Sequence, residues 1–195
     1  MTDQKSLFAF DENPVGRNES PAGLRYEPDF ISPAKEAELL AHIRAIEVQP
    51  FQFGAFEGKR RVAWFGWQYD YAVRKLTRAG DIPPWLHPLI ERIEAFDRLS
   101  PGSIRQVLIT EYEAGAGIGW HRDKPHFDRI YGLSLRTSCR FRFRRKRGGK
   151  WQRYAFQAEP RSLYRMDGAA RHEWEHSIPG LDQLRYSVTF RSMAE

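Results

Sequence analysis

The sequence has one cysteine, no long apolar run and no repeated segment. Cys139 has no second cysteine to pair with, which is typical of proteins from reducing compartments. No apolar run approaches the roughly 20 residues that a membrane-spanning helix needs. Residues 1–10 also lack the apolar stretch of a secretory signal. These absences argue against a disulfide-stabilised secreted domain and against a membrane partner, and they favour a cytoplasmic location.

The chain is basic, with 31 lysines and arginines against 25 acidic residues, a net charge of +6 and a pI of about 9.6. A basic excess favours a polyanionic partner such as nucleic acid, although many basic proteins bind none. The 41% of hydrophobic and 14% of aromatic residues are sufficient for a folded core. We expect one domain over residues 25–195, present as a monomer and preceded by a polar, turn-rich arm at residues 1–24.

Two amphipathic helices are predicted in the first half of the chain. Ser32 is a typical N-cap, Pro33 suits the first helical position, and apolar residues then recur at helical spacing to residue 47. A second helix begins at Pro83-Pro84 and ends before Ser100-Pro101-Gly102. Both helices are expected to cover one face of a sheet.

The segment between these helices, residues 48–72, is rich in aromatic residues and cations. One interpretation is a β-rich core segment with a charged hairpin tip near Glu57-Gly58. The other is a flap over a site, because exposed rings stack on bases and cations hold phosphates. The sequence leaves both open. The residues concerned are Phe51, Phe53, Phe56, Lys59, Arg60, Arg61, Trp64, Phe65, Trp67, Tyr69 and Tyr71.

The rest of the chain has the alternation and turn spacing of short β-strands. Leu108, Thr110 and Tyr112 share one face of the first strand. Short strands with two helices outside predict a mainly β, α+β domain with a sandwich or jelly-roll core. Residues 25–103 would then hold the helices and a substrate lid, and residues 104–192 the β core. Strands are predicted at 106–112, 130–135, 139–145, 151–156, 161–166 and 184–191.

His121-Arg122-Asp123 is the candidate metal-binding motif. A histidine and a carboxylate two residues apart on an extended segment point to the same side. With one more histidine they form a two-His-one-carboxylate face that holds Fe(II) and leaves positions open. We choose His176 as the third ligand, because Ser177-Ile178-Pro179-Gly180 ends its strand and directs it to the interior of the sheet; His172 is the alternative.

Arg185 and Arg191 lie six residues apart on the last predicted strand, so both point to the same face. Two arginines inside an apolar barrel would be costly without anions to pair with. Bidentate pairing with carboxylates would remove that cost, and one dicarboxylate could engage both guanidinium groups. An exposed strand face is the other interpretation.

The segment Arg140-Phe141-Arg142-Phe143-Arg144 alternates arginine with phenylalanine and continues into a basic turn, Arg145–Lys150. A solvated hairpin edge protected by charge against aggregation explains this pattern. A groove for a phosphate backbone explains it equally well.

Together these motifs resemble the AlkB family of Fe(II)- and 2-oxoglutarate-dependent dioxygenases. The resemblance rests on His121-Arg122-Asp123, on His176 within His-Ser-Ile-Pro, and on the segment from Arg185 to Arg191, which matches the family's R-Y-N-x-T-F-R except for Ser187. It covers about residues 24–192. It implies a double-stranded β-helix (jelly-roll, cupin-like) core with Fe(II) held by His121, Asp123 and His176.

The resemblance also implies a co-substrate site. Arg185, helped by Tyr112, would pair with the distal carboxylate of 2-oxoglutarate, and Arg191 would lie near the carboxylate that binds iron. Thr110 and Ser187 stand where the best-known members have asparagine, and both can still donate a hydrogen bond. Pro125 replaces the acidic residue with which DNA-repair members touch the target base, so base recognition by that route is in doubt.

The implied function is oxidative demethylation, or dealkylation repair, of N-alkylated bases in DNA or RNA. The reaction consumes O2 and 2-oxoglutarate and releases formaldehyde, succinate and CO2. We expect Trp67, Tyr69 and Trp120 in the pocket wall. The residues expected near phosphates are Lys59, Arg60, Arg61, Arg140 and Arg142. The same oxidation of a protein side chain, a modified tRNA or a small molecule is the enzymatic alternative, and a basic jelly-roll module that binds RNA is the non-enzymatic one.

Overall fold

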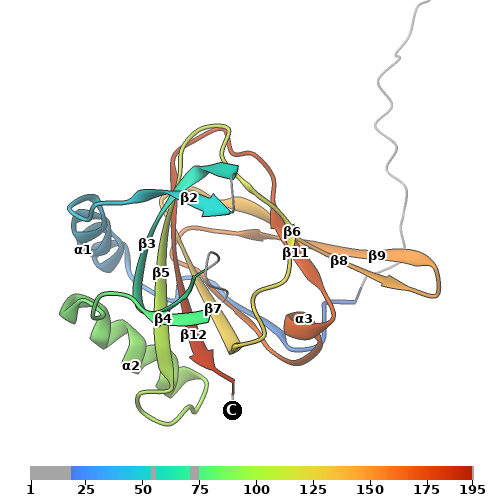
Figure 1. Ribbon diagram of the computed structural model, residues 1–195, viewed down its shortest axis with the longest axis horizontal. Helices are drawn as coiled ribbons and strands as arrows, with labels where there is room; N and C mark the ends of the chain where they lie inside the picture. The colour runs from blue at the N-terminus through green and yellow to red at the C-terminus, as the bar shows by residue number, and fades with distance from the viewer. Residues whose placement is uncertain (1–18, 54–55, 71–74, 195) are drawn as a thin grey trace, which may run out of the picture.

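The computed structural model describes residues 19–53, 56–70 and 75–194, which form two antiparallel β-sheets packed against each other (Figure 1). The larger sheet has the order β1 (Leu24–Glu27), β10 (Leu163–Met166), β7 (Phe127–Leu135), β12 (Arg185–Met193), β5 (Ile104–Tyr112), β3 (Phe56–Asp70) and β2 (Gln49–Phe53), with β4 (Lys75–Arg78) paired to β3. The smaller sheet has the order β6 (Ile118–His121), β11 (Glu175–Ile178), β8 (Cys139–Arg147) and β9 (Lys150–Ala158). The predicted mainly β fold with a double-stranded β-helix core is confirmed.

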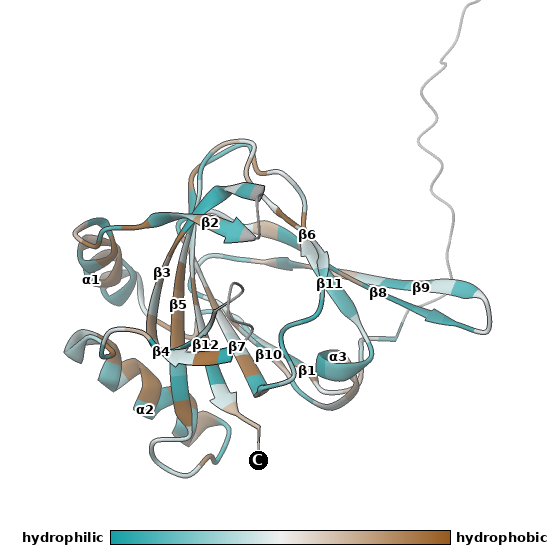
Figure 2. Ribbon diagram, in the orientation of Figure 1, coloured by the Kyte–Doolittle hydropathy of each residue, from teal (hydrophilic) through white to brown (hydrophobic). Residues whose placement is uncertain are grey.

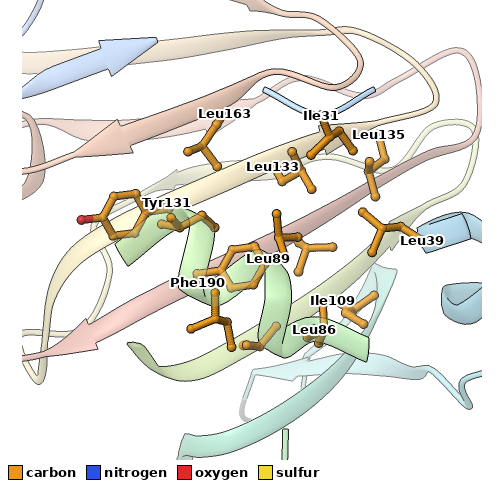
Figure 3. Packing of buried hydrophobic residues seen from close by; sticks show 14 of the residues in the cluster. Ile31, Leu39, Leu86, Leu89, Ile109, Tyr131, Leu133, Leu135, Leu163 and Phe190 are labelled. Atoms are coloured by element: carbon orange, nitrogen blue, oxygen red, sulfur yellow. The ribbon is translucent and has the colours of Figure 1, made fainter. Parts of the chain in front are cut away.

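Two helices cover the outer face of the larger sheet, as predicted (Figure 1). They are α1 (Pro33–Arg44) and α2 (His87–Phe96), the latter preceded by a 3-10 turn, η1 (Pro84–Leu86). Ser32 caps α1, because its hydroxyl accepts a hydrogen bond from the backbone N–H of Lys35 at 3.2 Å. Leu39 of α1 and Leu89 of α2 are almost fully buried. Figure 3 shows how side chains of both helices meet residues of β5, β7 and β12.

A second hydrophobic cluster lies between the two sheets. Tyr112 and Tyr164 from the larger sheet pack with Phe141 and Phe143 from the smaller one. The ring centroids of Phe141 and Tyr164 are 4.6 Å apart. Because aromatic rings bury a large apolar area, this cluster fixes the spacing of the sheets. A cavity remains beside it.

Several boundaries differ from the predictions. Helix α1 ends at Arg44 instead of residue 47, and β10 begins at Leu163 because Arg161 has a left-handed backbone with φ of 68°. β2 and β3 pair as an antiparallel hairpin, but Glu57 and Gly58 lie within β3, so the tip is displaced from the predicted position. The sequence reading also missed β1 and a short helix, α3 (Gly168–His172), which are too short to show periodicity.

Residues 1–18 of the predicted polar arm (residues 1–24) lie outside the described residues. The last residue of the predicted arm, Leu24, is the first residue of β1. Tyr71 of the predicted aromatic segment also lies outside them. In the part of the chain that the structure describes, no helix has the length and apolar character needed to cross a bilayer.

Candidate metal centre and co-substrate site

His121, Asp123 and His176 come together in the interior of the fold. One ligand atom from each lies within 4.8 Å of the others. His121 and His176 are direct partners in the antiparallel pair of β6 and β11, and their ring centroids are 4.2 Å apart. Opposite residues of adjacent strands project to the same face, so the pairing of β6 with β11 brings together two histidines that are 55 positions apart in the sequence.

Two of the three ligand candidates, His121 and Asp123, are oriented by hydrogen bonds on their far sides. Nδ1 of His121 lies 2.9 Å from the carbonyl oxygen of Gly119, which favours a protonated Nδ1 and leaves Nε2 free to bind a metal. Nε and Nη2 of Arg191 donate to Oδ1 of Asp123 at 3.0 and 2.6 Å. Oδ2 of Asp123 lies 3.4 Å from Nε2 of His176. One carboxylate oxygen is therefore held by Arg191, while the other faces the histidines.

The electrostatics keep these groups in the protonation states that bind a cation. Burial by itself raises the pKa of the Asp123 carboxyl. The nearby Arg191, His176 and His121 lower that pKa by more, so the net pKa lies well below its usual range. Burial, and next the neighbouring His121, lower the pKa of His176 to about 3. Near neutral pH the cluster thus offers a carboxylate and a neutral imidazole from His176, as metal ligation requires.

Arg171 of α3 secures the loop that carries Asp123, and sequence reasoning missed it. Its side chain is 4% exposed. Its guanidinium donates to the backbone carbonyl oxygens of Asp123, Lys124, Phe127 and Asp128 at 2.6 to 3.3 Å. Since α3 leads directly into the strand that carries His176, Arg171 ties the two ligand-bearing segments together. A buried arginine on a five-residue helix gives no periodic signal by which to find it.

Arg185 is fully buried, with 0% of its surface exposed. It lies on β12 opposite Tyr112 of β5, and Tyr112 lines the cavity. Its Nη2 donates to Oγ of Ser134 at 3.0 Å. Its Nε and Nη1 have no hydrogen-bond partner among the described residues. The guanidinium carbon lies 5.2 Å from the ring centroid of Tyr112, the residue opposite Arg185 on β5. A buried cation with unpaired N–H groups is costly. The Nε and Nη1 groups of Arg185 are therefore suited to bind an anion.

The sequence matches the 2OG-Fe(II) oxygenase superfamily over residues 23–191. The chain belongs to this superfamily. Its members use Fe(II), 2-oxoglutarate and O2.

Within this superfamily the chain is similar to ALKBH proteins. It is 31% identical to the Alkylated DNA repair protein ALKBH8 homolog of Arabidopsis thaliana, over 87% of this chain and 55% of that protein. The chain therefore spans about half the length of this relative. The structure of OsALKBH1 resembles it with a TM-score of 0.66 at 15% identity, over 89% of this chain and 98% of that one. A Pseudomonas putida prolyl-4-hydroxylase resembles it with a TM-score of 0.60 at 14% identity, over 89% and 93%. At such identities the two structures show the fold.

The residues present fit the metal and co-substrate of a 2OG-Fe(II) oxygenase. Two imidazole nitrogens and one carboxylate oxygen are the donor set that suits Fe(II) while leaving positions open. The unpaired N–H groups of Arg185 fit a carboxylate. Thr110, Tyr112 and Arg191 line the cavity that contains the metal cluster. Ser187 pairs with Thr110 across β12 and β5 and is buried. Arg185 thus offers donors for one carboxylate, and the His121, Asp123 and His176 cluster offers a metal position.

The cavity has a volume of about 450 Å³, and several residues predicted to bind substrate line it. Tyr69 and Arg60 of β3 and Trp120 of β6 are among the lining residues. Phe51 and Trp64, which the sequence reading placed in the aromatic segment without a specific role, line it as well. The ring of Tyr69 also contacts the loop after Asp123: Nζ of Lys124 is 4.6 Å from the ring centroid. Both interpretations of the aromatic segment fit the structure: β3 pairs with β5 in the larger sheet, and side chains of the segment line the cavity as those of a flap would.

Other predicted substrate residues lie elsewhere. Trp67 is not among the lining residues of the described chain; its backbone oxygen accepts a hydrogen bond from Gln106. Nε of Arg61 donates to Glu111 at 2.7 Å, and Nη2 of Arg61 forms an ion pair with Glu113 at 3.2 Å. A contact between Arg61 and phosphates stays a prediction. Lys59 is exposed away from the lining.

The remaining predicted contacts, Arg140 and Arg142, belong to β8 and also lie outside the lining of the cavity. Arg140 is exposed. Arg142 donates to Oγ of Ser177 at 3.1 Å and lies over the ring of Trp120. The alternative third ligand, His172, is exposed on α3 and lies outside the metal cluster.

Proposed function

We propose that the protein is an AlkB-like Fe(II)- and 2-oxoglutarate-dependent dioxygenase that dealkylates N-alkylated bases in DNA or RNA. The observation that carries this proposal is the cavity: it contains the His121, Asp123 and His176 cluster and is walled by aromatic and cationic side chains. Its volume falls in the range of about 300–1,000 Å³ that ligand sites span. Aromatic walls suit a planar base, since every base offers a face for stacking.

The name of the Arabidopsis relative supports the same class of substrate, because that protein is described as an alkylated DNA repair protein homolog. The cationic side chains Arg60 and Lys124 lie beside the aromatic ones in the cavity wall. A base in a duplex could reach the metal position only after being flipped out of the stack. The flap residues Phe51, Trp64 and Tyr69 would then contact the flipped base.

The chain's own residues would position the reactants. Bound Fe(II) would supply the chemistry that activates O2 at the expense of 2-oxoglutarate. His121, Asp123 and His176 would hold the metal from one side, and Arg191 keeps the Asp123 carboxylate in place. Arg185 would orient the distal carboxylate of the co-substrate. The aromatic walls would exclude water and hold the alkyl group close to the metal. Hydroxylation of an N-methyl group gives a hemiaminal, which releases formaldehyde and the repaired base.

The test is to measure succinate and formaldehyde with Fe(II), 2-oxoglutarate and oligonucleotides carrying different N-methylated bases. The panel contains DNA and RNA strands, each matched with an unmethylated strand of the same sequence. We expect succinate in excess of the unmethylated control, with an equal amount of formaldehyde. Stimulation by a proline-containing or methylated-lysine peptide, with none by any oligonucleotide, would instead assign a protein substrate.

A further inference from the structure

The outer face of the smaller sheet is a second surface of unusual composition. On β8, Phe141 and Phe143 point into the molecule, so the residues between and beyond them point outward. The register of β8 with β9 places Lys146 opposite Trp151 and Arg144 opposite Arg153. These four residues therefore share one face of the hairpin, which projects away from the body of the molecule (Figure 1). Figure 2 shows that this hairpin is largely hydrophilic.

Two tryptophans on this face are linked by arginines. The guanidinium carbon of Arg144 lies 4.5 Å from the ring centroid of Trp120 and 4.6 Å from that of Trp151. The guanidinium carbon of Arg142 lies 5.0 Å from the ring of Trp120 on the same side of the sheet. Trp120 also lines the cavity that holds the metal cluster. A continuous row of rings and guanidinium groups thus leads from the cavity to the hairpin.

Trp151 is the large apolar side chain that stands out to solvent among the described residues, with 43% of its surface exposed. The exposed part of the ring gains nothing from burial. A planar ring held beside an arginine offers a surface on which a base can stack.

The positive charge of this face is only partly neutralised. Arg144 pairs with Glu175 at 2.7 Å, and Arg142 is hydrogen-bonded to Ser177. Arg140, Lys146 and Arg153 form no ion pair with any described residue. No acidic residue occurs between Cys139 and Ala158. These cations are available to bind phosphates.

We propose that this face, from Trp120 at the cavity to Trp151 on the hairpin, binds a single strand of nucleic acid that runs into the active site. Bases stack on Trp151, and Arg140, Lys146 and Arg153 contact the phosphates. A single strand fits better than a duplex, because paired bases bury the faces that stacking needs. The inference rests on the proposed function for the class of substrate, and it adds the form of the strand and its path.

Protection of a sheet edge by charge explains part of the pattern. β9 is the edge strand, and lysines and arginines on an edge strand discourage pairing with other chains. That explanation leaves out the exposed Trp151, since an apolar ring on an edge works against protection. It also leaves out the arginines of β8, which is paired on both sides.

The experiment compares two faces of one hairpin. One variant is Trp151→Ala, and a second is the pair Lys146→Glu and Arg153→Glu on the outer face. The matched control is the pair Arg147→Glu and Lys150→Glu, which changes the net charge by the same amount on the opposite face. All five side chains changed in these variants are exposed, so none is needed for the core. Binding of a fluorescent, unmethylated 12-nucleotide strand and of its duplex is measured by anisotropy at several salt concentrations.

We expect the wild type to bind the single strand more tightly than the duplex. Trp151→Ala should weaken binding of the strand about tenfold. The outer-face pair should weaken it more and should lower the slope of log affinity against log salt by about 1.4, as the loss of two phosphate contacts predicts. The control pair should change affinity by less than about threefold.

Equal losses for both charge pairs, an unchanged affinity for Trp151→Ala, or tighter binding of the duplex would each overturn the proposal. So would tighter binding of a poly-glutamate peptide than of the oligonucleotide, because the face would then recognise acidic protein. The proposed function fails separately: a wild type that binds the strand through this face but forms no succinate with methylated oligonucleotides would refute the reaction and leave the strand-binding face intact.

Discussion

Arg185 carries a buried charge that the protein alone satisfies only in part. One of its nitrogens bonds Ser134, and two others lack partners among the described residues. This incomplete pairing lowers the stability of the protein without ligand. A carboxylate that paired with Nε and Nη1 would recover it, so the residue is better explained by a ligand than by stability.

This explanation predicts the behaviour of Arg185→Met. The free variant should keep its Tm or gain slightly, because an apolar side chain replaces an incompletely paired charge. With Fe(II) under anaerobic conditions, 2-oxoglutarate should raise the Tm of the wild type but not that of the variant, since charge-assisted hydrogen bonds worth about 1.5–3 kcal/mol are lost. Thermal unfolding with and without 2-oxoglutarate measures both effects. A Tm several degrees lower in the free variant, with an undiminished 2-oxoglutarate shift, would make Arg185 a structural residue.

Individual residues differed in how far the sequence could place them. The strand parity of Arg185 and Arg191 followed directly from the sequence, because alternation on a strand is a local rule. The spacing of His121 and Asp123 also pointed to one site, although β6 ends at His121 and Asp123 lies in the loop that follows. Arg171 could not be found this way. Its four partners are backbone carbonyls in a loop more than 40 positions away, and no side-chain pattern records such a contact.

At the scale of elements, the metal cluster depends on the close approach of β6 and β11. A Cβ atom on Gly117 would lie 2.6 Å from the carbonyl oxygen of Ile178 and 2.8 Å from the carbonyl carbon of Pro179. The next residue, Ile118, pairs with Ile178. Glycine at position 117 thus permits the backbone contact that brings His121 opposite His176.

We therefore expect Gly117→Ala to separate the two strands at this end. Overpacking of this kind costs about 1–3 kcal/mol, and affinity for Co(II), used as a stand-in for Fe(II), should fall about tenfold because the ligands are displaced. The matched control is Gly119→Ala two residues along the chain, where an added Cβ would meet nothing within 4 Å. Titration of both variants with Co(II), followed by visible absorption, provides the measurement. Equal affinities in the two variants would show that the strand contact does not set the ligand geometry.

The elements themselves were predictable where they were long. Both long helices and six strands followed from alternation, helical spacing and capping; the strands are β5, β7, β8, β9, β10 and β12. β1 and α3 have four and five residues, too few for any period to emerge. The pairing of β6 with β11 was also beyond the sequence, because register between distant strands depends on the packing of both sheets.

At the scale of the whole molecule, the two sheets have unequal outer faces. The larger sheet buries its outer face under α1 and α2 (Figure 1). The outer face of the smaller sheet carries arginines and Trp151. The net charge of +6 pointed to an anionic partner but not to a location. The sequence showed the alternation of Arg140–Arg144, yet only the register of β8 and β9 separates the cations into two faces.

The His121, Asp123 and His176 cluster is the proposed iron site, and anaerobic binding of Fe(II) tests it most directly. Wild-type protein, freed of metal and dialysed against Fe(II) with 2-oxoglutarate, should retain one iron per chain. His121→Ala and Asp123→Ala should retain none at the concentration that saturates the wild type, while circular dichroism shows that both are folded. His172→Ala, which removes an exposed histidine outside the cluster, should bind iron as the wild type does. A wild type that retains no iron, or a folded Asp123→Ala that retains as much, would contradict the assignment.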